Sequence, residues 1–127
     1  MGKVTAYYYM TELHKLPAKE FIDSLDFKSQ QKFFGVKELL EEFGQLLPYP
    51  HAKYIGEGIF ELRFHGMEGT IRVMYFFFHQ DKAVFTNGFI KKTGKTPRRE
   101  IRMAIKRRID FLNSQKGDDK HETSKSR

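Results

Sequence analysis

Three consecutive segments, 59–64, 70–78 and 83–92, are rich in apolar residues, and in the first two at least every second side chain is apolar. A period of two is the period of a β-strand, because successive side chains point to opposite faces of the sheet. Only the short stretches HGMEG and HQDK separate the segments, and connections of this length join neighbouring antiparallel strands. The sequence therefore predicts a three-stranded antiparallel meander in its second half.

Helical patterns flank the meander. Residues 16–26 and 27–44 predict two helices, the second with apolar positions at helical spacing and with Asp26 as its N-cap. A last helix is expected to begin after Thr96, its N-cap, with Pro97 in the first helical position. Two N-terminal helices can then pack on one face of the sheet, which leaves part of the other face open to solvent.

The remaining segments complete the predicted topology. β-Branched and aromatic residues at 4–10 predict a short first strand, and residues 46–58, rich in Pro and Gly, predict a connection. Residues 114–127 are polar and predict a disordered tail, so that one domain spans residues 1–113. The predicted fold class is α+β, with an antiparallel-dominated sheet and the element order β-α-α-β-β-β-α.

Positive charge is concentrated in one part of the chain. The net charge is +7, but residues 1–62 carry 7 basic and 9 acidic groups, whereas residues 63–108 carry 12 basic and 3 acidic groups. A division of this kind indicates one basic surface rather than a general solubility charge. Because the cations alternate with aromatic residues, we expect a polyanionic partner.

Composition excludes several classes of site. The chain has no cysteine, which rules out disulfides, thiolate zinc sites and cysteine nucleophiles. No apolar run reaches the length of a membrane span and the N-terminus lacks a secretory pattern, so we expect a cytoplasmic protein with no membrane partner. Zinc spacing, a phosphate-binding glycine loop and a Ser/His/Asp arrangement are also missing, and we expect no metal and no cofactor.

Three motifs in the basic part of the chain resemble a known family. GEGIFELRF is followed by IRVMYFF and then by FTNGFIKKTGKTPRREIRMAIKRR. The combination of E-L-R, R-V-x-Y and F-x-K-K-T-x-K-T-P at these separations resembles the HigB-like branch of the RelE/ParE superfamily, the toxins of type II toxin–antitoxin modules, with many phage-derived relatives. The resemblance is closest over residues 55–112, and the RelE-like fold agrees with the predicted element order.

The resemblance implies a toxin that cleaves mRNA, usually while the message is threaded through the ribosomal A site, and that inhibits translation. It also implies a cognate antitoxin, HigA-like and DNA-binding, that neutralises the toxin. We therefore expect a metal-independent endoribonuclease whose partners are the antitoxin and ribosome-bound mRNA. Two alternatives stay open, a gyrase-poisoning toxin of the same superfamily and a non-catalytic nucleic-acid-binding module.

Four cations on the meander are candidate catalytic residues. RNA cleavage without a metal requires deprotonation of the 2′-hydroxyl, stabilisation of the charge on the phosphate and protonation of the 5′-oxygen. Arg63 and Arg72 are expected to project from the open face and to bind the phosphate through their forked donors. Lys91 and Lys92 end the third strand on opposite faces, and the crowded Lys91 is also a candidate base.

The proton-transfer groups are less constrained. His51, in the loop before the meander, is the histidine we select as catalytic, while His65 and His79 at strand ends are further candidates. Glu61 resembles a general base, but we interpret it as a partner of Arg63 or of the basic helix. Tyr75 is expected to belong to the core because of its position in a strand.

A second group of residues is expected to bind RNA without taking part in the chemistry. Lys95, Arg98 and Arg99 lie near the start of the last helix, whose N-terminus itself attracts anions. Thr93 lies among the lysines. Phe89 is a candidate for stacking on a nucleobase, against the alternative that it packs in the core.

Overall fold

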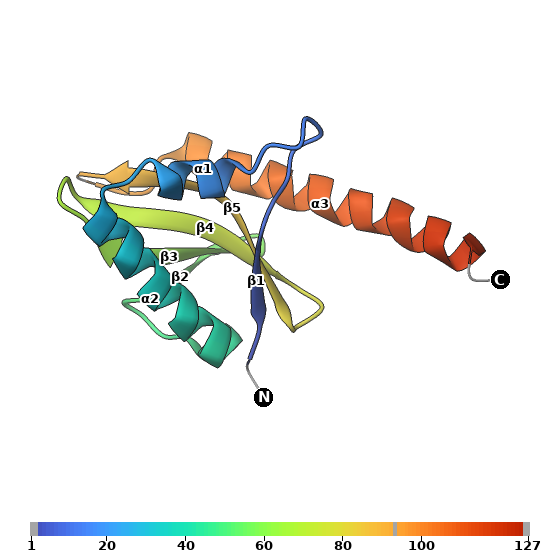
Figure 1. The fold of residues 1–127 in the computed structure, drawn as a ribbon, viewed down its shortest axis with the longest axis horizontal. Coiled ribbons are helices and arrows are strands. Elements are labelled where there is room, and N and C mark those ends of the chain that lie inside the picture. The colour runs from blue at the N-terminus through green and yellow to red at the C-terminus, as the bar shows by residue number, and fades with distance from the viewer. Residues whose placement is uncertain (1–2, 93, 126–127) are drawn as a thin grey trace.

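One sheet organises the part of the chain that the structure describes. The computed structural model describes residues 3–92 and 94–125, with the backbone alone for residues 117–125. Within these residues the strand order is β1-β5-β4-β3-β2, and β1 runs parallel to β5 while the other pairs are antiparallel (Figure 1). The elements are β1 (Thr5–Tyr8), α1 (Pro17–Asp23), α2 (Phe27–Phe43), the 3-10 turn η1 (Gly44–Leu46), β2 (Ala52–Gly56), β3 (Ile59–His65), β4 (Thr70–Phe78), β5 (Lys82–Lys91) and α3 (Arg98–Lys125).

The predicted meander is confirmed as β3, β4 and β5, and the fold class is α+β as expected. In its register, Arg63 of β3 lies opposite Arg72 of β4, and Arg72 lies opposite Phe89 of β5. Directly opposed residues share a face of the sheet. The two candidate arginines are therefore neighbours on one face, as the alternation predicted.

One strand was missed by the sequence prediction. Residues 46–58, expected to be a connection, contain β2, which pairs with β3 and places Ala52 opposite Leu62. The strand is short, and its hairpin turn is built from Gly56, Glu57 and Gly58, all with positive φ. The prolines before β2 and the glycines of its turn resemble a loop composition, and they hide a strand that is defined by its pairing with β3.

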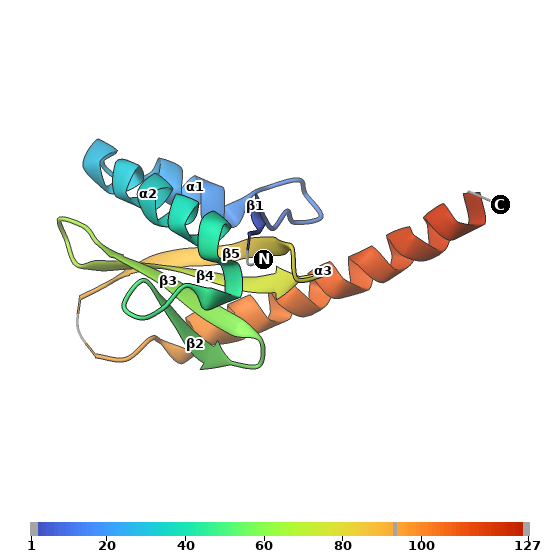
Figure 2. The same ribbon diagram turned by 90° about the horizontal axis from the view of Figure 1, so that it is seen from below.

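Helices cover both faces of the sheet. In Figure 2, α1 and α2 lie on one side and α3 crosses the other side before extending past the sheet edge. The two N-terminal helices therefore pack together on one face, as predicted. Each face has its own apolar cluster. The first is centred on Phe33, Leu40, Leu62, Val73, Tyr75 and Phe85, and the second on Ile59, Met74, Phe76, Val84 and Ala104.

The edge strand β1 is protected by α2. The N–H of Val4 donates to the carbonyl oxygen of Glu41 at 2.8 Å, and the N–H of Ala6 donates to its Oε2 at 2.9 Å. Unpaired N–H groups on an edge strand would otherwise be free to pair with another chain. Glu41 therefore both docks α2 and closes this edge of the sheet.

The start of α2 is fixed by the cap predicted from sequence. The carboxylate of Asp26 accepts from the N–H of Ser29 at 3.1 Å and from its hydroxyl at 2.7 Å. These hydrogen bonds favour the ionised form and lower the pKa of Asp26. At the other end the helix gives way to Gly44, which has a positive φ.

A bulge in β5 anchors α3. Met74 pairs with Asn87 and Tyr75 pairs with Phe85, so Thr86 is the extra residue and its carbonyl is free of the ladder. Arg107 of α3 donates to this carbonyl at 2.9 Å. Asn87 donates to Oε1 of Glu100 at 2.9 Å. Two polar contacts thus fix the orientation of α3 on the sheet.

The helix α3 continues beyond the boundary predicted after residue 113 and reaches Lys125. The single domain over residues 1–113 and the disordered tail over 114–127 stay predictions, and residues 126 and 127 lie outside the described residues. Among the helices of the described residues, none is both long enough and apolar enough to cross a membrane.

Two glycine substitutions should change stability in opposite directions. A Cβ added to Gly35 in α2 meets no atom within 4 Å, so Gly35→Ala should stabilise the fold by about 0.5–1 kcal/mol through helix propensity. A Cβ added to Gly88 would lie 2.4 Å from the ring of Phe21, so Gly88→Ala should destabilise by about 1–3 kcal/mol. Urea denaturation measures both. A midpoint for Gly88→Ala at or above that of the wild type would contradict the packing of α1 on β5.

Candidate functional site

A cleft lined by cations lies where β2, β3 and β4 approach the start of α3. It has a volume of about 530 Å³, and none of its described lining residues is acidic. We call it the cationic cleft. Its lining residues are Tyr49, Lys53, Tyr54, Ile55, Arg63, Arg72, Gly94, Lys95, Thr96, Arg98 and Ile101.

A buried carboxylate organises the floor of the cationic cleft. Glu61 has no exposed surface, and its Oε1 lies 3.0 Å from Nη1 of Arg72 and 3.9 Å from Nε of Arg63. The two arginine side chains retain only 12% and 19% exposure. Opposite charges held in this way restrict each guanidinium to one orientation. The interpretation of Glu61 as a partner of Arg63 is confirmed, and Arg72 is its closer partner.

Thr96 joins this network from the segment before α3. Its hydroxyl donates to Oε2 of Glu61 and accepts from Nη1 of Arg72 at 3.2 Å. We expected Thr96 to cap the last helix, but its side chain is instead committed to the sheet. The reason is that a fully buried carboxylate needs a donor for each oxygen. Arg72 donates to Oε1 of Glu61, and Thr96 donates to Oε2.

Lys91 holds the same segment from the end of β5. It is only 8% exposed, and its ammonium donates to the backbone carbonyl of Lys95. This position orders the loop that carries Lys95 and Thr96, and Lys91 does not line the cationic cleft. The geometry supports a positioning role for Lys91, whereas a base would need access to the substrate.

The predicted RNA-binding residues are distributed around this loop. Lys95 and Arg98 line the cationic cleft, while Arg99 is exposed outside it. Lys92, predicted to be catalytic, is also exposed and does not line the cleft. Phe89 packs against the apolar cluster under α3 and is half-buried, which agrees with the core alternative. Thr93 lies outside the described residues.

His51 lies in a neighbouring cleft rather than in the cationic one. This second cleft, about 380 Å³, runs between α2 and the end of β3, and we call it the histidine cleft. Arg63 lines both clefts and separates them. The full lining of the histidine cleft is Lys32, Gly35, Val36, Pro50, His51, Arg63, Phe64, His65 and Thr70.

Sequence reasoning missed three residues of the cationic cleft, Tyr49, Lys53 and Tyr54. The guanidinium of Arg63 lies 5.1 Å from the ring centroid of Tyr49, and the ring of Tyr54 packs against Phe60 at 4.9 Å. Both tyrosines are more than half exposed. The exposed ring of Tyr49 therefore lies beside a cation, which is the combination that binds single-stranded nucleic acid. Tyr54 lies opposite Phe60 in the register, so its ring packs on the other face of the sheet. The missed signal was the pairing of β2 with β3.

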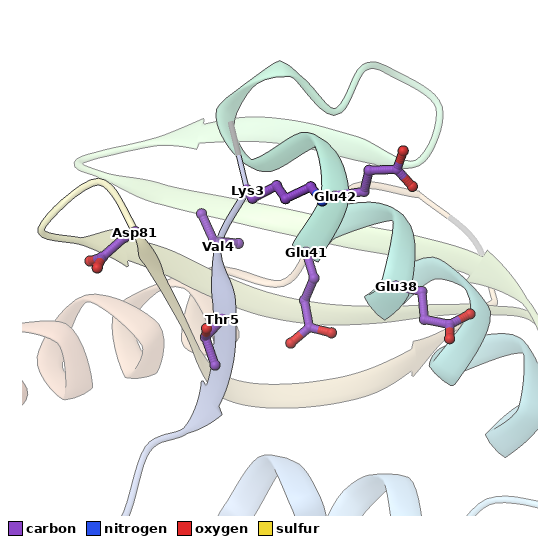
Figure 3. A pocket seen from close by; sticks show the side chains of 7 residues that line it. All are labelled: Lys3, Val4, Thr5, Glu38, Glu41, Glu42 and Asp81. Carbon is purple, nitrogen blue, oxygen red and sulfur yellow. The ribbon is translucent and has the colours of Figure 1, made fainter. Parts of the chain in front are cut away.

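A hollow at the opposite edge of the sheet has the opposite charge. It lies between β1 and α2 and is shown in Figure 3, where Glu41 extends from the helix toward the strand. Glu38, Glu42 and Asp81 also line it, together with Lys3. Four carboxylates repel a phosphate, so the anion-binding capacity belongs to the β2 edge and not to this one.

Among the described residues, neither Tyr75 nor a cluster of acidic side chains forms a second candidate site. Tyr75 is 1% exposed in the first apolar cluster, as predicted, and burial raises the pKa of its hydroxyl. Within the described residues there is no group of three or more His, Asp or Glu side chains placed to hold a metal ion. The cationic cleft can bind a phosphate, orient it through fixed guanidinium groups and stabilise charge that develops on it.

Comparison with known proteins gives one family. The model of a family described as phage derived protein Gp49-like (DUF891) matches residues 20–108, which include all elements from most of α1 to the first turns of α3. The search of curated proteins found no match.

Removing the charge of Glu61 should destabilise the fold strongly. Glu61→Gln leaves the largely buried Arg72 without its counter-charge, so we expect a loss of about 3 kcal/mol in the free energy of unfolding. Arg72→Met in the same chain should recover part of the loss, because the uncompensated charge is then absent. Urea denaturation measures both. The control is Glu42→Gln on the exposed side of α2, and a wild-type midpoint for Glu61→Gln would contradict this account.

Proposed function

The chain belongs to the phage-derived Gp49-like family, which is related to the RelE-type toxins of toxin–antitoxin systems, and we propose that it is a toxin that cleaves mRNA on the ribosome. The motifs over residues 55–112 support the HigB-like branch in particular. The observation that carries the proposal is the cationic cleft. Five cations from different segments of the chain converge there, next to the exposed ring of Tyr49.

The cations suit the charge that appears during RNA cleavage. The 2′-oxygen attacks the adjacent phosphorus, the bond to the 5′-oxygen breaks, and a cyclic phosphate and a free 5′-hydroxyl result. Negative charge rises on the phosphate oxygens in the transition state, and donors fixed beforehand stabilise it without reorganisation. Glu61 supplies that fixation for Arg63 and Arg72, since it holds both guanidinium groups from below.

The lining residues divide into those that meet the substrate and those that position them. Arg63, Lys95 and Arg98 offer donors to the cleft, and Lys53 extends the positive surface along β2. Arg72 is more deeply buried and is already bonded to Glu61 and Thr96. Arg72 thus contributes charge to the site and structure to its floor.

Proton transfer is assigned to the side chains beside Arg63. His51 lies in the adjoining histidine cleft, and the N–H of Arg63 donates to its backbone carbonyl at 2.8 Å. Its imidazole is half-buried and remains the histidine proposed to carry a proton. The amino group of Lys91 is occupied by the Lys95 carbonyl, which makes it a weaker candidate for the base.

The family relationship suggests an antitoxin as the second partner. We propose that this antitoxin is HigA-like and DNA-binding, and that acidic groups on it compete with RNA for the basic surface. Such competition would account for neutralisation, because a cleft occupied by carboxylates holds no phosphate. The proposed location of both partners is the cytoplasm.

The decisive experiment is a reconstituted translation reaction in which mRNA 5′ ends are mapped by primer extension. We expect new cleavage sites within the reading frame that depend on both the protein and the ribosomes. Intact mRNA with normal translation would contradict the proposal. Inhibition of gyrase supercoiling would then favour the gyrase-poisoning alternative, and RNA binding without any inhibition would favour a binding module.

Arg63→Ala should lower the cleavage rate by about a hundredfold to a thousandfold, because a fixed donor to the phosphate is lost. The measurement is the initial rate at the mapped sites, with the variant shown to be folded by circular dichroism. Lys19→Ala on α1 is the matched control, since it removes one exposed cation far along the chain from the cleft. An equal loss in both variants would mean that net charge alone explains the effect.

Arg98→Ala should weaken RNA binding in a salt-dependent way. Arg98 is exposed at the rim of the cationic cleft, so its removal should lower the slope of log affinity against log salt by about one unit. Fluorescence anisotropy with single-stranded RNA over a salt series measures the slope. A slope that stays at the wild-type value would remove Arg98 from the interface.

A further inference from the structure

We propose that the histidine cleft binds one unstacked nucleobase of the RNA strand whose phosphates occupy the cationic cleft. The inference rests on the proposed function, because it assigns a base-binding subsite to the same RNA interface. It also gives the protein a means of preferring one base over another at the position that enters the cleft.

The two clefts share one lining residue. Arg63 lines both of them, and its backbone N–H is bonded to His51 at 2.8 Å, so the wall between the clefts is held in place. A phosphate bound to the guanidinium on one side brings its own nucleotide to the boundary. The base of that nucleotide or of its neighbour then has a cavity next to it, on the α2 side of Arg63.

The lining of the histidine cleft suits a base better than a phosphate. Its walls include the apolar side chains of Val36, Pro50 and Phe64. The volume of about 380 Å³ falls at the lower end of the range for small-ligand pockets. A flat ring with two apolar faces fits against these side chains.

Polar groups at the cleft can contact the edge of a base. His51, His65 and Thr70 line it, and they offer ring nitrogens and a hydroxyl in the same cavity. Lys32 closes one end, since its ammonium donates to the carbonyl of His65 at 3.0 Å and ties α2 to the end of β3. Single-stranded RNA is generally read in this way, through stacking on flat side chains and hydrogen bonds to base edges.

Gly35 keeps the cleft open on the α2 side. It is the only position of the described lining without a side chain, and a Cβ built there meets nothing within 4 Å. A glycine within a helix costs about 1 kcal/mol relative to alanine, so its presence in α2 needs a reason. Access for a ligand supplies one, because a longer side chain at this position would enter the space.

The test compares RNA with and without bases. We would measure the affinity of the wild type for RNA pentamers of A, C, G or U and for an abasic pentamer with the same phosphates, by anisotropy at low salt. Stacking of one base should make at least one pentamer bind about tenfold tighter than the abasic chain. The abasic chain reports on the cationic cleft alone.

Gly35→Leu is the variant that fills the histidine cleft, and Gly35→Ala is its matched control. Both replace glycine by a better helix former, so both should fold. We expect Gly35→Leu to bind all pentamers like the abasic chain, with the affinity for the abasic chain unchanged. Gly35→Ala should keep the wild-type difference.

The outcomes separate this inference from the proposed function. If the abasic chain binds in a salt-dependent way and no base increases the affinity, the base subsite alone is overturned. The histidine cleft would then be a site for a side chain of a protein partner. A base preference that survives Gly35→Leu would move the preference to Tyr49 and overturn the subsite as well. Failure of every pentamer to bind would overturn the base subsite, while the proposed function is decided separately by the cleavage sites mapped in the translation reaction.

Discussion

The carboxylate of Glu61 is the constraint on which the rest of the site depends. A carboxylate with no exposed surface is tolerated only where charges and donors surround it, and here Arg72, Arg63 and the Thr96 hydroxyl do so. These groups come from two strands and from the segment before α3. The same ion network therefore fixes the guanidinium groups and draws the loop against the sheet. Both the floor and one wall of the cationic cleft exist because Glu61 must be compensated.

The two edges of the sheet differ in how they are covered and in their charge, and this difference determines where the candidate site lies. At the β1 edge, Glu41 of α2 takes up the free N–H groups and the surrounding hollow is acidic. On the other face, the helix α3 is anchored over β5 by Arg107 and Glu100 and packs on the sheet as far as Phe111, while the residues at its start line the cationic cleft. The face near β2 and β3 is consequently left for a ligand. The positive charge of this face favours an anionic ligand, which agrees with the proposed function.

The sequence predicted what depends on periodicity and failed where segments distant in the chain converge. The alternation of apolar residues predicted the meander and placed Arg63 and Arg72 on one face of the sheet. A local cap pattern predicted Asp26 as the N-cap of α2. Both predictions succeeded because each pattern spans only a few residues. The strand β2 and its residues Lys53 and Tyr54 escaped notice, since a five-residue strand between prolines and glycines is defined by its partner. The burial of Lys91 escaped for the same reason. Its acceptor is a backbone carbonyl, and no residue pattern encodes where a carbonyl points.

The crowding of lysines and arginines around residues 91–99 has a physical explanation in this arrangement. One of these cations, Lys91, is used internally, and its bond to the Lys95 carbonyl holds the loop in shape. Lys92, Lys95, Arg98 and Arg99 remain exposed on that loop and on the first turn of α3. Repulsion among these exposed cations is screened by salt and destabilises the fold only slightly. It acts within a segment that the Glu61 network already fixes. A loop held in place by the Glu61 carboxylate of β3 and the Lys91 ammonium of β5 cannot relax by spreading its charges apart. An anion that enters therefore gains the full attraction of the cluster without first having to order it, which is the property that a phosphate-binding site requires.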